Sequence, residues 1–494
     1  MSENCLLIYR RGIMDQRLFL KRYIDEHQNL FQRVALAIWN YAELRFEEWE
    51  SSKLISGILE EEGFAVERGI GEMKTAFVAT YGTGKPVLSF LGEFDALSEL
   101  SQAGGTAEQQ SIVAGGAGHG CGHHLLGTAS LAAALATKAY MEQHGVVGTI
   151  RYYGCPGEEG GSGKTFMAKE GAFAGTDTAI SWHPGTYTSV WTAETLANIQ
   201  ASFAFIGRAS HAAAAPHLGR SGLDAVELMN IGSNYLREHL IDEARVHYAI
   251  TNAGGLSPNV VQPKAEVLYL MRAPTLEQTK AIYERVKNIA KGAALMTDTT
   301  LEIRFEKACS NFVRNYVLED VMNEELIAVG PLSYTEEEHR FAETIRQTFS
   351  EEDREQTMVE LANLVENPGQ EWLGQLRHKA LIDEMVPVSK KRTLLAGSTD
   401  VGDVSWIAPT VQCYVTCFAS GTAFHTWQMV SQGATTTAYK GMSHAALIMA
   451  ATAVRLLHDP DLVRQAKEEW EERFANLQYV SPIPNGVKPA PMQR

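Results

Sequence analysis

Metal-binding and acid–base side chains follow several separate apolar runs of this 494-residue chain. Glu158 and Glu159 come after TIRYYGCPG, His183 lies in DTAISWHP, and His425 comes shortly after CYVTCFAS. Ligands in open α/β sheets bind outside the carboxyl ends of the strands, so groups far apart in sequence can converge there. The pattern therefore predicts one polar crevice built from distant segments.

Two further segments carry side chains of the same kind. Glu93 and Asp95 follow the run PVLSFLG, and Cys121 and His123 lie in GGAGHGCGHHLLG, where a glycine-rich loop enters a helix candidate. A thiolate, imidazoles and carboxylates are ligands of Zn²⁺ and similar divalent ions, and a bound ion lowers the pKa of water to about 7. This chemistry is that of a hydrolase.

Each of these residues also has a simpler interpretation. A single histidine is usually structural, a single cysteine is usually a small buried apolar residue, and neighbouring carboxylates are usually solvated. Glu158 and Glu159 are flanked by CPG and GGSG, which argues against a surface helix. The pair suits a division of labour in which one carboxylate binds metal and the other is the general base.

The segment GEEGGSGKT resembles a phosphate-binding loop, but its spacing is wrong. Glu158 occupies the position that requires the first glycine of that loop, and Gly157 is one place too early. Two carboxylates would also repel phosphates. We therefore reject a nucleoside triphosphatase.

Alternating strand and helix candidates predict an α/β fold with a sheet covered on both faces. Between Leu196 and Asn311 the order changes to β-α-β-β-α-β, which is ferredoxin-like and indicates a second domain inserted into the first. We expect a first domain from 1–195 and 312–494, with a mixed, mostly parallel central sheet, and an inserted α+β domain over 196–311. The acidic segment 335–383 is expected to be a solvated face of the first domain.

Composition narrows the partners and the location. With 43 basic and 59 acidic residues the net charge is −16, which argues against binding to nucleic acid or anionic membranes. No apolar run approaches the roughly 20 residues of a membrane-spanning helix, and the amino-terminal segment has no small-residue cleavage site. Six cysteines in this length are expected to be free thiols. We expect a cytoplasmic protein.

The motifs CGHH, GEEGGSGKT, SWHP, GRASHAAAAPHLGRSGLDAVEL and SPNVVQP occur in this order along the chain. Together they resemble the amidohydrolase branch of the aminoacylase and carboxypeptidase-type dinuclear metallopeptidases, over nearly the whole chain. The resemblance implies a catalytic domain with an inserted lid or dimerisation domain. It also implies two divalent metal ions per chain, zinc or manganese, with cobalt possible for such a mixed ligand set.

The resemblance also implies roles for the metal-site residues. Cys121 would be shared between the two ions, and four residues would complete their coordination: His123, Glu159, His183 and His425. Glu158 would be the general base, and Asp95 would orient a ligand imidazole.

For the substrate, the resemblance implies residues of the inserted domain. His211 would stabilise an oxyanion, commonly in the neighbouring subunit's site, and Asn259 and Arg272 would hold the substrate's carboxylate. Without the resemblance we would interpret Arg272 as part of a surface salt bridge. Glu93 is a departure, because many relatives carry a metal-binding histidine there, and His124 replaces an asparagine or aspartate.

These observations predict a metal-dependent amidohydrolase that acts on a small N-acyl amino acid similar to aminobenzoyl-glutamate. A dipeptidase or an N-acetyl amino acid deacylase could use the same site. The residues are also compatible with an aromatic amine deaminase and with a non-catalytic subunit of a hetero-oligomeric hydrolase. We expect a homodimer or a heterodimer with a related subunit. An acidic substrate side chain would need a further cation, for which Lys164, Arg208 and Arg220 are candidates.

Overall fold

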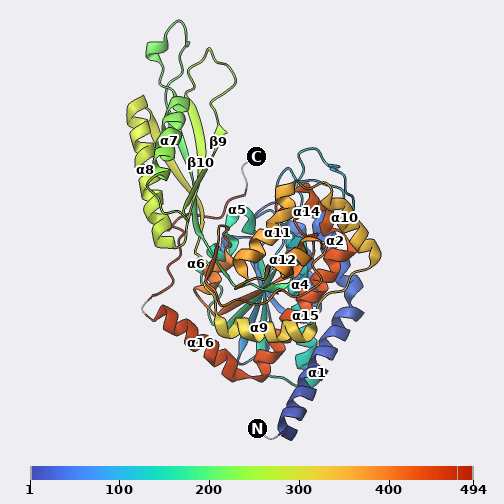
Figure 1. Ribbon diagram of the computed structural model, residues 1–494. Coiled ribbons are helices and arrows are strands. Elements are labelled where there is room, and N and C mark those ends of the chain that lie inside the picture. The colour runs from blue at the N-terminus through green and yellow to red at the C-terminus, as the bar shows by residue number, and fades with distance from the viewer. Residues whose placement is uncertain (1–2, 476, 492–494) are drawn as a thin grey trace.

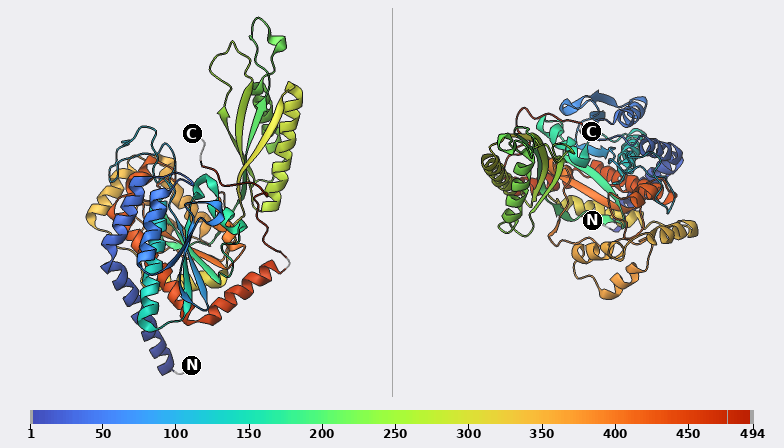
Figure 2. Two further views of the ribbon diagram at one scale, coloured as in Figure 1. Left: turned by 180° about the vertical axis from the view of Figure 1, so that it is seen from behind. Right: turned by 90° about the horizontal axis from the view of Figure 1, so that it is seen from above.

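The computed structural model describes the backbone of residues 3–475 and 477–491, and the side chains within these ranges from residue 15 onward. Cys5 therefore lies outside the described side chains. Figures 1 and 2 show a large α/β body and an elongated small domain that projects from it. No helix of the described residues is long and apolar enough to cross a membrane.

The large body is built on a mixed seven-stranded sheet with the order β1-β2-β4-β3-β5-β13-β6. The four central strands β4, β3, β5 and β13 run parallel, and the strands outside them pair antiparallel. The predicted mixed, mostly parallel sheet is confirmed. The strands are β1 Ala65–Arg68, β2 Phe77–Thr83, β3 Val87–Glu93, β4 Gly148–Cys155, β5 Thr178–Gly185, β6 Ser189–Val190 and β13 Thr410–Thr416.

Both faces of this sheet are buried, which explains why its strands are nearly continuous apolar runs. Phe90 and Tyr152 pack into one core with the long helices α4 and α15, and their neighbours Leu91 and Tyr153 pack into a second core on the other face. The helices of the large body are α1 Glu3–Glu26, α2 Gln28–Tyr41, α3 Trp49–Glu61, α4 His123–His144, α5 Glu158–Gly161, α6 Gly163–Lys169, α9 Tyr316–Val329, α10 Glu336–Arg346, α11 Glu351–Leu364, α12 Gln370–Arg377, α13 Val401–Ser405, α14 Trp427–Gly433, α15 Thr436–His458 and α16 Pro460–Phe474.

The small domain, which comprises the elements from β8 to β11, has an antiparallel sheet with the order β11-β8-β10-β9. This is the strand order of a ferredoxin-like β-α-β-β-α-β unit. The limits 1–195, 196–311 and 312–494 stay a prediction. The elements of the small domain are β8 Ala197–Ile206, α7 Gly222–Arg237, β9 Arg245–Asn252, β10 Lys264–Ala273, α8 Leu276–Thr297 and β11 Thr300–Cys309.

One face of the small sheet is covered by α7 and α8, and the other face is open. Ile199, Ala201 and Phe203 of β8 are buried on the helix-covered side, and Asn198 and Gln200 alternate with them on the open side. A further parallel pair, β7 Ala193–Thr195 and β12 Thr393–Leu395, lies where the chain enters the small domain. The open face therefore begins beside the large body.

Candidate metal centre

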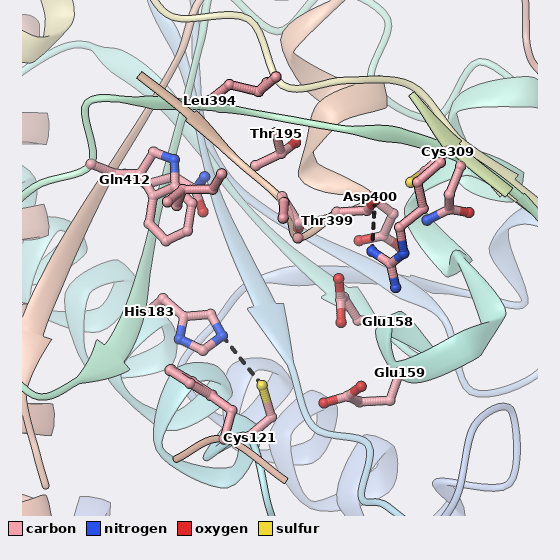
Figure 3. Close-up of a pocket in the computed structure, with 18 of the residues that line it drawn as sticks. Cys121, Glu158, Glu159, His183, Thr195, Cys309, Leu394, Thr399, Asp400 and Gln412 are labelled. Atoms are coloured by element: carbon pink, nitrogen blue, oxygen red, sulfur yellow. Dashed lines mark hydrogen bonds between the residues drawn. The ribbon is translucent and has the colours of Figure 1, made fainter. Parts of the chain in front are cut away.

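The predicted polar residues meet at the carboxyl ends of the parallel strands. Glu93 ends β3, Glu158 begins the short helix after β4, and His183 lies near the end of β5. Cys121 comes just before α4, and Figure 3 shows it close to His183 on one wall of a cavity. Sheet topology thus brings together segments that are far apart along the chain.

Two possible metal-binding groups overlap at one sulfur atom. Cys121, His123 and His183 offer ligand atoms that all lie within 4.8 Å of one another, and so do Cys121, Glu159 and His425. The Sγ of Cys121 lies 3.5 Å from Nε2 of His183. Nε2 of His425 lies 3.2 Å from a carboxylate oxygen of Glu159. The five predicted metal ligands are therefore close together, with Cys121 common to both groups.

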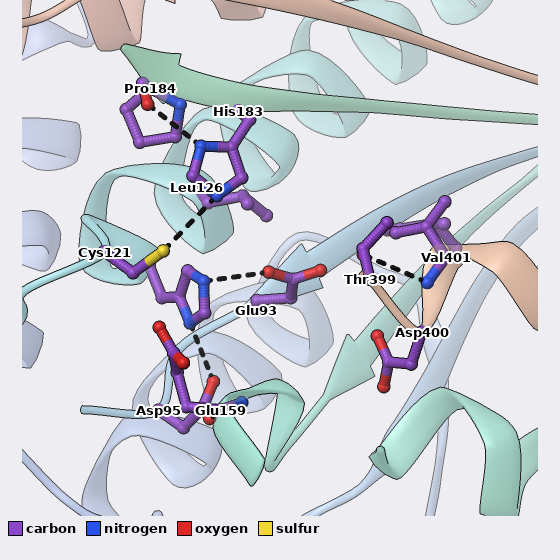
Figure 4. Close-up of polar contacts among 12 residues, drawn as sticks. Glu93, Asp95, Cys121, Leu126, Glu159, His183, Pro184, Thr399, Asp400 and Val401 are labelled. Atoms are coloured by element: carbon purple, nitrogen blue, oxygen red, sulfur yellow. Dashed lines mark hydrogen bonds and ion pairs between the residues drawn. The ribbon is translucent and has the colours of Figure 1, made fainter. Parts of the chain in front are cut away.

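Hydrogen bonds orient these ligands from behind, as Figure 4 shows. Nδ1 of His123 donates to Asp95 at 2.9 Å, and the second oxygen of Asp95 accepts from the backbone N–H of Glu159 at 2.7 Å. Nδ1 of His183 donates to the carbonyl of Pro184 at 2.9 Å. Each imidazole therefore presents its Nε2 to the centre, which is the usual arrangement around a metal-binding histidine.

Backbone contacts position the loops that carry the remaining ligands. The N–H of His425 donates to the carbonyl of Gly120 at 2.8 Å, and His425 has a positive φ of 61°, which is uncommon for a residue other than glycine. The N–H of Gly157 donates to the buried carboxylate of Glu48 at 2.8 Å. Glu48 was not identified from the sequence, because it lies in none of the motifs and far along the chain from the other residues of the centre.

Two buried polar atoms of the centre make no hydrogen bond of regular geometry among the described residues, although each lies 3.2 Å from an ion-pair partner. They are Nε2 of His123, which lies beside Glu93, and Oε1 of Glu159, which lies beside His425. Buried polar atoms are nearly always paired, so such atoms call for an explanation, and a bound ion is one. Both atoms belong to the groups described above. The chemistry of the donor set, together with these two atoms that lack a regular hydrogen bond, fits divalent metal ions.

The two neighbouring glutamates are in opposite electrostatic environments. Burial raises the pKa of Glu158 well above its ordinary value, and the nearby carboxylates of Glu93 and Asp400 raise it further. Burial alone would also raise the pKa of Glu159. The imidazole of His425, whose Nε2 lies 3.2 Å from the carboxylate, and the positive charge of His123 outweigh burial, and the pKa of Glu159 falls to about 2. In the absence of metal, Glu158 is thus the more easily protonated member of the pair.

Lys164 is not available to a substrate. Its ammonium is fully buried, 2.5 Å from a carboxylate oxygen of Glu93 and 2.7 Å from one of Asp400. The three residues form a charge cluster beneath the centre, and Oε2 of Glu93 also lies 3.2 Å from Nε2 of His123. Asp400 was missed in the sequence because it follows no strand of the main sheet.

His211 and Asn259 lie elsewhere. They occupy two exposed loops that contact each other, where the N–H of Ala212 donates to the carbonyl of Asn259 at 2.9 Å. The loop of His211 follows β8, whose ten residues span about 30 Å, and the loop of Asn259 connects β9 to β10 at the same far end of the small sheet. Neither residue lines the cavity next to the metal centre, whereas Arg272 does. The chain thus places Arg272 near the centre and the other two residues far from it. Arg208 and Arg220 pair with each other through their backbones near these same loops.

A cavity of about 1110 Å³ connects the centre with the open face of the small sheet and with helix α11. Gln356, Val359, Glu360 and Asn363 of α11 form part of its wall, so the acidic segment is not merely the solvated face that we expected. Other lining residues come from three places: Cys121, Glu158, Glu159, His183 and His425 of the centre; Asn198, Gln200, Leu270, Arg272, Lys307 and Cys309 of the small domain; and the segment 391–400.

One side of the cavity is aromatic. The rings of Tyr187 and Tyr414 lie 4.6 Å apart, and Trp191 meets Tyr414 edge-on at 6.0 Å. Phe424 lies 5.5 Å from the imidazole of His183. All four rings line the cavity, so a flat apolar group would find a complementary surface beside the centre.

Comparison with known proteins assigns a family to this arrangement. The family model of "Peptidase family M20/M25/M40" matches residues 90–367. The chain is 49% identical over 475 residues to a subunit of p-aminobenzoyl-glutamate hydrolase from Escherichia coli (strain K12), covering 96% of this chain and 99% of that protein.

Two more distant proteins resemble the chain over most of its length. It is 25% identical to human Xaa-Arg dipeptidase, with 93% of each chain covered. The crystal structure of a Bacillus subtilis protein described as a dinuclear metal-binding peptidase of the M20 family matches with a TM-score of 0.52 and 17% identity, covering 88% of this chain and 99% of that one.

Proposed function

The chain belongs to peptidase family M20/M25/M40, and from this membership we propose that it hydrolyses the amide bond of a small N-acyl amino acid of the p-aminobenzoyl-glutamate type. The observation that carries the proposal is the pair of ligand groups that share Cys121 at the bottom of a cavity. The 49% identity to a p-aminobenzoyl-glutamate hydrolase subunit supports the substrate class.

In this proposal two divalent ions are held by the two groups. His123 and His183 would bind one ion, Glu159 and His425 would bind the other, and Cys121 would bind both. Such ions supply Lewis acidity that activates water and polarises an amide carbonyl. The ligand set suits zinc, and manganese or cobalt would also be accepted.

Glu158 is the proposed general base and acid. It lines the cavity, and its carboxylate lies within 4.8 Å of ligand atoms of His123 and Glu93. It would take a proton from the attacking water and return it to the nitrogen of the leaving amino acid. The raised pKa of Glu158 suits a group that holds this proton between the two steps.

The two sides of the cavity suit the two halves of such a substrate. Tyr187, Trp191 and Tyr414 would contact an aromatic acyl group. Arg272 would bind the α-carboxylate, and its guanidinium is oriented by a hydrogen bond to Ser398 at 3.0 Å. A planar guanidinium matches the geometry of a carboxylate.

We also propose that His211 and Asn259 act in the site of a second chain. They lie on the exposed loops far from their own chain's cavity, so a copy of this chain or a related subunit must bring them to a substrate. Exposed apolar side chains along α7 and the edge strand β9 offer a surface for such pairing, namely Ile231, Tyr235, Tyr248 and Ile250. The E. coli relative is itself described as a subunit.

A second candidate is hydrolysis of dipeptides with a basic residue. It is favoured by Glu360, a carboxylate in the cavity wall whose described hydrogen-bond partner is a neutral side chain, Gln356. Human Xaa-Arg dipeptidase is a relative by sequence. N-acetyl amino acid deacylation and deamination would use the same metal chemistry.

The test is hydrolysis of p-aminobenzoyl-glutamate by the purified chain with Zn²⁺ or Mn²⁺ and a chelated control. We expect metal-dependent release of glutamate and about two ions per chain by elemental analysis. Release of ammonia instead would indicate deamination. Cleavage of an arginine dipeptide alone would favour the second candidate. Failure on all these substrates, with the metals bound, would indicate a missing partner subunit.

We propose a cytoplasmic location. The five cysteines with described side chains, at 121, 155, 309, 413 and 417, are free and buried. Unpaired thiols are typical of a reducing compartment.

A further inference from the structure

Strand β11 contains a β-bulge that changes which face its side chains occupy. Phe305 pairs with Ala201 of β8, but Lys307 pairs with Gln200, so Glu306 is an extra residue in the ladder. Without the bulge, Lys307 would alternate onto the same face as Phe305, beneath α7 and α8. With the bulge it lies on the open face, which lines the cavity. Bulges near active sites commonly redirect a side chain in this way.

Lys307 is a buried cation without a charged partner. Its relative exposure is 8%, and its ammonium makes no hydrogen bond or ion pair with any side chain that the structure describes. The adjacent Glu306 cannot neutralise it, because that carboxylate accepts hydrogen bonds from Ser202 and Arg304, each at 2.8 Å. An ammonium that lines the cavity and has no counter-charge is available to bind an anionic ligand there.

The residues next to Lys307 form a polar patch that contains an unpaired amide oxygen. Gln200 lies directly across the ladder from Lys307, and Asn198 lies across from Cys309 on one side and Arg272 on the other. Oδ1 of Asn198, which is 2% exposed, has no hydrogen-bond partner among the described residues. Figure 3 shows Cys309, which marks this wall, on the opposite side of the cavity from Gln412 and His183. The patch therefore faces the aromatic side across the centre.

Other cations near the cavity are engaged or exposed. Lys164 is neutralised by Glu93 and Asp400. Arg392 pairs with Glu194 at 2.9 Å, and the exposed Lys391 donates to the carbonyl of Asn363. Lys307 and Arg272 thus remain as two cations on the same face of the sheet. They lie two strands apart across the sheet and two residues apart along it.

We propose that Lys307 binds the side-chain carboxylate of an acidic leaving amino acid, with Gln200 beside it, while Arg272 binds the α-carboxylate. Lys307 is then the residue that makes the enzyme selective for N-acyl derivatives of dicarboxylic amino acids such as glutamate. The proposal rests on the proposed amidohydrolase function and specifies its substrate class.

The test compares two substrates that differ only in the charge of the side chain, p-aminobenzoyl-glutamate and p-aminobenzoyl-glutamine. We expect the metal-loaded wild-type chain to have a higher kcat/KM for p-aminobenzoyl-glutamate than for p-aminobenzoyl-glutamine. Lys307→Met should lower the ratio of the two kcat/KM values about 10- to 100-fold, mainly through KM for glutamate. Lys307→Arg should restore most of the ratio, because the charge is kept. Lys264→Met, which removes an exposed cation of β10 outside the cavity, is the matched control and should keep the wild-type ratio.

Two results would overturn the proposal: an unchanged ratio in Lys307→Met, or an equal fall for both substrates, which indicates a structural role. Calorimetric binding of free glutamate and free glutamine separates this proposal from the proposed function. The wild-type chain could hydrolyse neither substrate and still bind free glutamate more tightly than free glutamine. If Lys307→Met then loses this binding preference, the proposed subsite is supported although the proposed amidohydrolase function is refuted. Equal binding of both amino acids by the wild-type chain would refute the subsite.

Discussion

The metal centre and the outer loops of the small domain both carry predicted functional residues. Those of the centre lie together beside the cavity, whereas those of the loops are exposed and far from it. Cys121, His123 and His183 converge from separate segments into one cluster within a single chain. His211 and Asn259 are also close to each other, but they lie on exposed loops away from their own cavity. The ligand groups of the first region lie within one chain, and in our proposal the second region requires another chain. In that proposal, the motifs describe one site assembled by folding and one completed by association.

The largest expected effect tests the region assembled by folding. Glu158→Ala should lower kcat about 1000-fold, because the proton transfers lose their carrier. Bound metal should stay near the wild-type amount, since Glu158 belongs to neither of the groups that share Cys121. Steady-state kinetics with elemental analysis measure both quantities. Activity close to wild type would remove Glu158 from the role of base.

The next effect tests the region completed by association. His211→Ala should lower kcat about 100-fold, as expected for the loss of one oxyanion donor. Mixing the impaired His211→Ala and Glu158→Ala chains should raise activity above that of either variant alone. One of the two sites of a mixed dimer then has an intact base and an intact histidine from the other chain. If mixing restores nothing although mixed dimers form, the assignment to a second chain is wrong.

A smaller effect concerns the support of the metal ligands. Asp95→Asn should weaken metal binding about 10- to 100-fold, because its carboxylate orients both the ring of His123 and the backbone of Glu159. Titration with a competing chelator measures this affinity. Asp298→Asn, which removes an exposed partner of Arg220 in the small domain, is the control and should leave the affinity unchanged. Equal affinities for Asp95→Asn and wild type would contradict the supporting role.

The smallest effect sharpens the role of the pairing surface. Ile250→Asp places a charge on the exposed edge strand β9 and should weaken association about tenfold. Light scattering over a concentration series measures the dissociation constant. Activity should fall together with the dimer fraction, whereas metal content should not change. A dimer as tight as wild type would indicate that the chains associate through another surface.

Much of the fold was predictable because its signals are local. The apolar runs of β3, β4, β5 and β13 indicate a sheet buried on both faces, and the family that the motifs predicted is confirmed. The individual roles of the metal-site residues stay predictions. Lys164 illustrates the limit of such reasoning, because only the fold reveals that Glu93 and Asp400 neutralise it.

Features that depend on contacts between distant segments could not be predicted from the sequence. Helix α11 looked like a solvated acidic segment, yet one of its faces lines the cavity. Lys307 belongs to no motif of the sequence, and only the bulge at Glu306 places it on the cavity side of the sheet. Neither arrangement has a signature in residue spacing, since each depends on which element packs opposite.

The sequence by itself determined the family, the α/β class and the set of side chains capable of metal chemistry, because periodicity and motif spacing are local properties of the chain. Tertiary structure decided which of these side chains meet. The order of parallel strands brings the metal-site residues to one edge of the sheet, and the length of the small domain carries His211 and Asn259 away from it. Convergence is a property of topology and packing, which residue spacing alone does not encode.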